Sequence, residues 1–182
     1  MEKKHALVIG GTGMLSDVTL WLAEKGYVVS VIGRDRIRHE IVRGKSHDPE
    51  LINSLKVDYR DHALLETLVK DAIEEYGPIS CVVSWTPFLE SLELINRIIS
   101  EKNLNWKLFQ VMGSRRYFEK NQLEVTPQCH HRSIYLGFVM EDNHSRWLTL
   151  EEIAGGVIES VKEDREESVI GVLHPYEKRP GY

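Results

Sequence analysis

The first residues whose types and spacing can do chemistry form a glycine-rich segment near the N-terminus. From Gly10 to Ser16 the chain reads G-G-T-G-M-L-S, which contains G-x-G-x-x-S and, overlapping it, G-x-x-G-x-x-S. Such loops let the backbone approach a pyrophosphate, while N–H groups of the following helix face its charge. The segment therefore predicts a dinucleotide-binding loop. Its contacts would come from Gly10, Gly11, Thr12, Gly13, Met14 and Leu15.

The context of this loop supports the prediction. A short apolar run precedes it, and apolar residues at helical spacing follow it, as the pattern requires. A tight strand-to-helix turn that binds nothing is the alternative interpretation. Ser16 stands where the pattern usually has a third glycine, and its extra bulk predicts a helix slightly farther from the strand.

The end of the second predicted strand bears on the choice of cofactor. A carboxylate at this place accepts from a ribose 2′-hydroxyl, whereas a cation binds a 2′-phosphate. Gly33 is followed at once by Arg34, and Arg36 and Arg38 add positive charge. Planar guanidinium groups suit bidentate recognition of phosphate, so NADP(H) is favoured over NAD(H). Alternatively Asp35 caps the next helix or reaches the ribose, and the arginines form a solvated surface.

Short apolar runs alternate with segments of helical periodicity along most of the chain. Residues 113–132 break the alternation, and we expect an irregular segment with at most one short helix there. A capping-box order at Thr149 to Glu152 predicts a helix start. Strands are predicted at 6–9, 27–32, 54–58, 79–85, 106–112, 133–140 and 169–173, and helices at 14–22, 64–73, 88–99 and 149–161.

This order of elements predicts an α/β fold of three layers. We expect a doubly wound, mostly parallel, Rossmann-like sheet of about seven strands, with right-handed crossovers and helices on both faces. No internal repeat and no linker composition occurs, so residues 1–182 are expected to form a single NAD(P)-binding domain.

Several motifs together resemble the short-chain dehydrogenase/reductase family. They are the glycine loop, the strand end at Gly33-Arg34, Asp58 after the third strand and Ser84 in the fourth. The resemblance covers the first ~115 residues in order and the remainder more loosely. It implies that Asp58 contacts the adenine amino group. It also places Ser84, Trp85 and Thr86 along the nicotinamide ribose and Ser114 at the substrate-facing serine.

The chain departs from that family at the proton donor. The family uses a tyrosine with a lysine four residues later, and no tyrosine of this sequence has that partner. Ser114, Tyr117 and Lys120 are spaced i, i+3 and i+6, so a helix starting here would bring them toward one face. We take this trio as the candidate catalytic group. A solvated loop with Tyr117 tucked inward is the alternative.

Two further features have competing interpretations. Trp85 could form a flat wall over the cofactor ring, or fill a gap between sheet and helix. Cys129-His130-His131 does not predict a metal site, because consecutive side chains cannot easily converge on one tetrahedral ion. Cys81 lies in an apolar run where a buried thiol is expected.

Composition limits the class of protein and its partners. The 182 residues carry 23 Lys and Arg against 28 Asp and Glu, a formal charge of −5, which gives nucleic acid no general electrostatic attraction. The chain shows neither a secretory leader nor a run of membrane-spanning length, so no membrane partner and a cytoplasmic location are expected. A small-molecule substrate is expected, and a homo-oligomer is left open.

The sequence thus favours an NADP(H)-dependent oxidoreductase of atypical short-chain dehydrogenase type, with a non-standard proton donor. A dinucleotide-binding sensor or partner-binding module without turnover is the alternative, since the catalytic helix is missing from the pattern. A methyltransferase is a weaker third candidate, because Arg34 stands where that class usually has an acidic residue.

Overall fold

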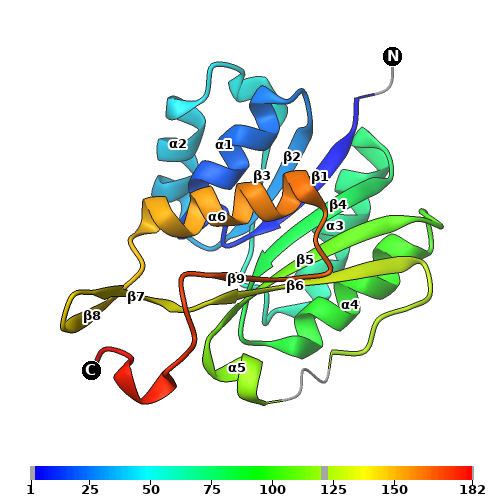
Figure 1. Cartoon of the computed structure of the whole chain (residues 1–182). Coiled ribbons are helices and arrows are strands. Elements are labelled where there is room, and N and C mark those ends of the chain that lie inside the picture. Colours follow the sequence, from blue (N-terminus) through cyan, green and yellow to red (C-terminus); the bar gives the residue numbers. More distant parts are fainter. Residues whose placement is uncertain (1–2, 120–122, 182) are drawn as a thin grey trace.

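The computed structural model describes residues 3–119 and 123–181. Its centre is a seven-stranded sheet in the order β3-β2-β1-β4-β5-β6-β9, and every neighbouring pair is parallel (Figure 1). The strands are β1 (His5–Ile9), β2 (Val28–Gly33), β3 (Ile52–Lys56), β4 (Ile79–Trp85), β5 (Trp106–Gly113), β6 (Cys129–Leu136) and β9 (Glu167–Ile170).

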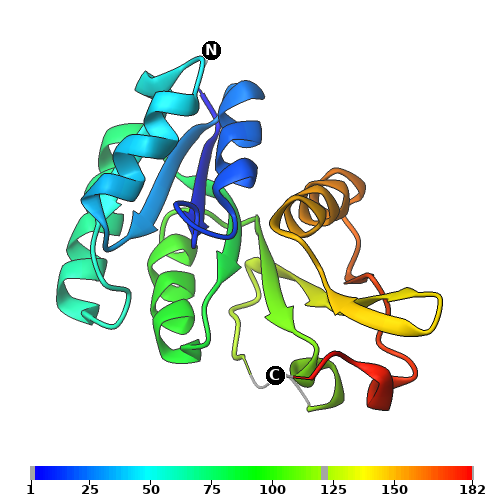
Figure 2. The same ribbon diagram turned by 90° about the vertical axis from the view of Figure 1, so that its left-hand side faces the viewer.

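Two helical layers cover the sheet, which explains why its central strands are apolar on both faces. One apolar core joins α1 (Ser16–Glu24), α2 (Arg36–Lys45) and α6 (Leu150–Glu163) to the sheet, and the other joins α3 (His62–Tyr76) and α4 (Leu89–Ser100) to the opposite face. Figure 2 shows α6 beside α1 on one side of the sheet and α4 on the other. All five residues of β1 are buried as a result.

The crossover through α6 has the opposite hand to the others. Going from β1 to β2 and from β6 to β9 takes the chain in opposite directions along the sheet, yet α1 and α6 lie on the same face. If α1 makes the usual right-handed crossover, the connection through α6 is left-handed, which corrects the expectation of uniformly right-handed crossovers. The long β6–α6 connection, which contains a hairpin, carries the chain around to that face.

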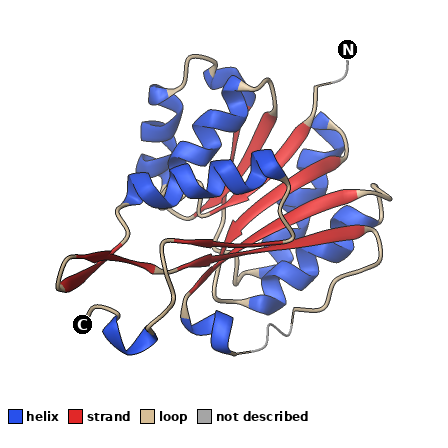
Figure 3. Cartoon of the chain, in the orientation of Figure 1, coloured by secondary structure: helices blue, strands red, loops and turns tan. Residues whose placement is uncertain are grey.

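That hairpin is formed by β7 (Phe138–Glu141) and β8 (His144–Trp147), a separate antiparallel pair. It projects from the carboxyl end of β6 (Figure 3). The sequence pattern had merged β7 with β6 into one strand, and it had missed β8. Gly137 separates the two strands, and a Cβ there would meet the carbonyl oxygen of Val172, so only glycine permits this close approach.

The Rossmann-like α/β fold class is confirmed, and most predicted elements are present with shifted ends. β3 ends at Lys56 rather than 58, and β9 ends at Ile170 rather than 173. β6 begins at Cys129, so part of the segment predicted as irregular is a parallel strand paired with β5.

The connection from β5 to β6 contains little regular structure in the part that the structure describes. It includes α5 (Arg115–Phe118), a single turn, and two 3₁₀ turns occur elsewhere, at Pro49–Leu51 and Tyr176–Lys178. None of the helices in the described ranges is long and apolar enough to cross a membrane.

Candidate functional site

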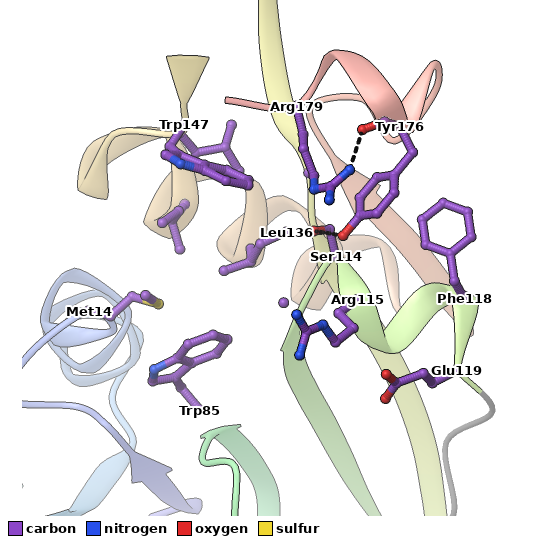
Figure 4. Close-up of a pocket in the computed structure, with 14 residues that line it drawn as sticks. Met14, Trp85, Ser114, Arg115, Phe118, Glu119, Leu136, Trp147, Tyr176 and Arg179 are labelled. Atoms are coloured by element: carbon purple, nitrogen blue, oxygen red, sulfur yellow. Dashed lines mark hydrogen bonds between the residues drawn. The ribbon is translucent and has the colours of Figure 1, made fainter. Parts of the chain in front are cut away.

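A cavity of about 610 Å³ opens at the carboxyl ends of the central strands (Figure 4). Ligands of open parallel sheets bind at this end, where neighbouring crossovers diverge. The cavity is walled by the glycine loop, the ends of β4, β5 and β6, the start of α6 and the C-terminal segment. Its lining residues are Met14, Trp85, Gly113, Ser114, Arg115, Phe118, Glu119, Leu136, Gly137, Trp147, Leu148, Ile153, Tyr176 and Arg179.

The glycine loop makes a compact turn between β1 and α1. Gly10 has φ of +87°, a conformation that favours glycine, and its carbonyl accepts from the amides of Gly13 at 3.1 Å and Leu15 at 3.0 Å. At the N-cap of α1, Leu15 offers no side-chain acceptor to the first amides of the helix. An anion can therefore take the role that a capping side chain would otherwise fill.

Two glycines of the loop serve different purposes. A Cβ on Gly11 would lie 2.5 Å from Thr19 Oγ1 and 2.9 Å from side chains of β1 and β2, so this glycine permits close packing of helix on sheet. A Cβ on Gly13 would meet only Arg38 Nη1 at 3.7 Å and a backbone oxygen at 3.9 Å. Gly13 therefore leaves an open approach to the loop, with a guanidinium beside it.

At the end of β2, Asp35 is engaged in capping α2. Its carboxylate accepts from the amides of Ile37 at 2.8 Å and Arg38 at 3.4 Å. Arg34 and Arg38 both extend into solvent, with side chains 70% and 63% exposed. Each also lies near a carboxylate, Arg34 at 3.7 Å from Asp58 and Arg38 at 3.9 Å from Asp35, whereas Arg36 pairs more closely with Glu40 along the helix at 3.1 Å.

Gly33 itself leaves no room for a larger residue. A Cβ at this position would lie 2.8 Å from Thr12 Oγ1, so the loop hydroxyl occupies the space that a side chain would need. His39 donates from Nε2 to the Gly33 carbonyl at 2.8 Å, and burial lowers the pKa of His39. These contacts hold the strand end against the glycine loop.

Asp58 lies beyond the end of β3 in a cluster of positive charge. Arg60 binds it through the guanidinium at 2.8 Å and the backbone amide at 2.9 Å, and Arg34 approaches to 3.7 Å. These hydrogen bonds lower the pKa of Asp58 to about 2. The carboxylate is thus ionised and exposed enough to accept one further donor, such as an exocyclic amine.

The three residues at the end of β4 take different directions. Ser84 is fully buried on the α3–α4 face of the sheet, and its hydroxyl has no hydrogen-bond partner among the described residues. Thr86 accepts from the amide of Phe88 at 3.2 Å and helps turn the chain into α4. Trp85 alone of the three lines the large cavity, with its Cβ close to Gly10.

Ser114 and Tyr117 are not joined by their side chains. Ser114 is 7% exposed and lines the cavity, whereas Tyr117 packs edge-on against Tyr135 at 5.3 Å and is not among the lining residues. The predicted helix that should align the trio is only one turn long. Lys120, its third member, lies outside the described residues.

The partner that the structure gives Ser114 is Tyr176, from the C-terminal segment. The two hydroxyl oxygens lie 3.2 Å apart across 62 residues of sequence. Arg179 packs over the Tyr176 ring at 4.3 Å and also lines the cavity. Sequence reasoning missed this pair because its spacing differs from the family pattern. The aromatic and basic residues of the tail do not by themselves indicate that it reaches the cavity.

A capping arrangement fixes the wall formed by α6 and the hairpin. The Thr149 hydroxyl accepts from the amide of Glu152 at 3.1 Å, and the Glu152 carboxylate accepts from the amide of Thr149 at 2.9 Å, as the sequence predicted. Arg146 of β8 binds the same carboxylate at 2.7 Å, and the pKa of Glu152 falls to about 2. These contacts seat Trp147 and Ile153 against the cavity.

The cysteines take no part in this site. Burial raises the pKa of both Cys81 and Cys129 to about 12, so both thiols are protonated at neutral pH. Over the ranges 3–119 and 123–181, no group of three or more His, Cys, Asp or Glu is placed to hold a metal ion.

Comparison with known proteins gives the fold a family context. No family model and no curated protein sequence matches the chain. Among solved structures, it resembles a β-ketoacyl-ACP reductase from Bacteroides thetaiotaomicron, with a TM-score of 0.72, 17% identity and 94% and 98% of the two chains covered.

Two further solved structures show the same likeness. A short-chain dehydrogenase/reductase from Serratia marcescens gives a TM-score of 0.70 at 14% identity, covering 92% of this chain and 96% of that one. An actinorhodin polyketide ketoreductase solved with NADPH gives 0.70 at 12% identity, covering 93% and 97%. The chain therefore has the Rossmann-like fold of the short-chain dehydrogenases/reductases.

Proposed function

We propose that this protein is an NADP(H)-dependent oxidoreductase that reduces a small carbonyl compound. The observation that carries the proposal is that one continuous cavity is lined both by Met14 of the glycine loop and by the buried residue Ser114. A dinucleotide lying along the loop would extend its reactive end into this cavity. A carbonyl oxygen beside Ser114 would then lie within reach of a hydrogen-bond donor.

The residues present fit a dinucleotide phosphate. Gly13 leaves the loop open, and no side chain caps the first amides of α1. Gly10 to Leu15 would hold the pyrophosphate, Asp58 the adenine amine, and Trp85 the ribose side of the nicotinamide. When bound, the reduced nicotinamide supplies the hydride.

The geometry at the end of β2 supports NADP(H) over NAD(H). Asp35 is committed to the α2 cap, so it is poorly placed to accept from a ribose hydroxyl. Arg38 lies beside Gly13, and Arg34 lies 3.7 Å from Asp58. Two exposed guanidinium groups around this position suit a 2′-phosphate.

A non-catalytic dinucleotide-binding module is the second candidate. The observation that favours it is the β5–β6 connection, where α5 is a single turn. Such a protein would bind NADPH and turn nothing over, and it would present the bound state to a partner.

The test is NADPH consumption at 340 nm with a panel of aliphatic, aromatic and carboxylate-bearing aldehydes and ketones, alongside equilibrium binding of NADPH. We expect saturable binding and turnover of at least one panel member. Stoichiometric binding without turnover would support the second candidate, and absence of binding would contradict both.

A further inference from the structure

We propose that Tyr176, delivered by the C-terminal segment, is the proton donor of this site and that Ser114 is its hydrogen-bond partner. The inference rests on the proposed oxidoreductase function and assigns the acid for that reaction. It places the two hydroxyl groups together as the binding point for the substrate carbonyl oxygen.

The geometry of the two hydroxyl groups is the first support. Tyr176 Oη and Ser114 Oγ lie 3.2 Å apart, and both residues line the 610 Å³ cavity. Figure 4 shows the phenol directed at Ser114, with Met14 and Trp85 on the far side of the cavity. A carbonyl compound bound between the hydroxyl pair and Met14 would have its oxygen at the two hydroxyl groups and its carbonyl carbon toward the glycine loop.

The tail that carries Tyr176 is anchored to the fold at both ends. Before it, Val172 and Phe138 exchange backbone hydrogen bonds of 2.8 Å and 3.0 Å. After it, the Lys178 carbonyl accepts from the hydroxyl of Ser145 on β8. The phenol is therefore held in place by the same hairpin that forms one wall of the cavity.

The ring itself is fixed by contacts on both sides. Phe118 packs against it with centroids 4.4 Å apart, and the guanidinium of Arg179 lies 4.3 Å from the ring centroid. Arg179 also donates to the Tyr176 carbonyl at 3.0 Å. A cation this close stabilises the negative charge that the phenol acquires as its proton leaves.

The proposed step balances in atoms and electrons. The carbonyl carbon gains the hydride supplied by the reduced dinucleotide, and the π electron pair of the C=O bond moves to oxygen. That oxygen takes the proton from Tyr176 Oη, so an O–H bond forms in the alcohol as the phenol O–H bond breaks. Ser114 donates to the resulting phenolate, and water entering the open cavity returns the proton.

Tyr176→Phe tests the assignment, because it removes the hydroxyl and keeps the ring between Phe118 and Arg179. We expect turnover of the best panel substrate to fall by about 10²- to 10⁴-fold, the usual contribution of a general acid. NADPH affinity and the thermal midpoint should stay at wild-type values. Tyr76→Phe, which removes a phenol hydroxyl at the opposite end of the sheet beside His5, is the matched control.

A second readout does not depend on turnover. The NADP⁺-loaded protein should bind the same carbonyl compound without reducing it, and quenching of Trp85 and Trp147, which line the cavity, would report that binding. Loss of one hydrogen bond to the carbonyl oxygen should weaken binding by about fivefold in Tyr176→Phe and in Ser114→Ala. Tyr76→Phe should bind as wild type does.

The outcomes separate this inference from the function on which it rests. If the wild type binds and oxidises NADPH but Tyr176→Phe retains its turnover, the assignment is wrong and the function stands. A large loss in Tyr117→Phe with none in Tyr176→Phe would also overturn it. A wild type that binds NADPH but reduces nothing in the panel overturns it in favour of the binding module.

Discussion

Gly11 and Gly13 are two positions apart but meet different surroundings, and alanine at each should have a different effect. Gly11→Ala would drive a methyl group into Thr19, Val8 and Val31 at 2.9 Å or less. We expect the free energy of unfolding to fall by about 1–3 kcal/mol, the usual cost of overpacking. Gly13→Ala meets no contact shorter than 3.7 Å, so its stability should match the wild type.

The same pair distinguishes a binding loop from a simple turn. Gly13→Ala places a methyl group on the open side where a pyrophosphate would approach, so we expect NADPH affinity to fall at least tenfold. Chemical denaturation and fluorescence titration of both variants measure the two effects. Unchanged NADPH affinity in a fully folded Gly13→Ala protein would show that the loop is only a turn.

Arg34, Arg36 and Arg38 differ in their surroundings although they alternate in sequence. Arg38→Ala removes the guanidinium beside Gly13, and we expect NADPH affinity to fall about tenfold or more with NADH affinity unchanged. Arg36→Ala, whose side chain pairs with Glu40, is the matched control and should bind both nucleotides as the wild type does. An equal loss of NADPH affinity in the two variants would indicate a general electrostatic attraction of the arginines rather than a specific phosphate site.

At the level of secondary-structure elements, an ion pair between Arg146 of β8 and Glu152 of α6 links the hairpin to the start of the helix. Its carboxylate titrates in acid. The pKa of Glu152 in the folded protein is about 2, below its ordinary 4.5, because Arg146 and the Thr149 amide bind the carboxylate. A lowered carboxyl pKa gives stability that is present above the unfolded value and is lost as pH falls through the folded one.

Glu152→Gln should therefore flatten the decline of the thermal midpoint between pH 4.5 and pH 2, measured by circular dichroism. Glu151→Gln, which changes an exposed carboxyl on the same turn, is the control and should keep the wild-type slope. A slope that is the same in all three proteins would mean that the Arg146 contact contributes nothing to folding.

Elements with a clear hydrophobic pattern were predictable from sequence. Elements whose limits depend on contacts with distant parts of the chain were not. β4 has the predicted limits because a mostly apolar run, Ile79 to Trp85, is bounded by Gly77-Pro78 and a loop. The start of β6 at Cys129 was missed, since its polar residues His130 to Arg132 become a strand only by pairing with β5. Local pattern carries no information about such pairing.

At the scale of the whole molecule, the candidate site depends on segments that meet only after folding. The glycine loop could be predicted because its chemistry lies within seven consecutive residues, Gly10 to Ser16. The Ser114–Tyr176 contact could not, because 62 residues separate the two and the tail reaches the cavity by pairing with Phe138. The left-handed α6 crossover, likewise, is a property of the assembled sheet.

The carboxyl end of the sheet is proposed to bind a phosphorylated dinucleotide, and one titration tests this binding. Purified protein is titrated separately with NADPH and NADH while quenching of its four tryptophans is followed, and the titrations are repeated with Arg34→Ala. We expect saturable NADPH binding, tighter than NADH binding, that weakens by about 1.5–3 kcal/mol in the variant, the scale of a charge-assisted contact. Failure of the wild type to bind either nucleotide would contradict it.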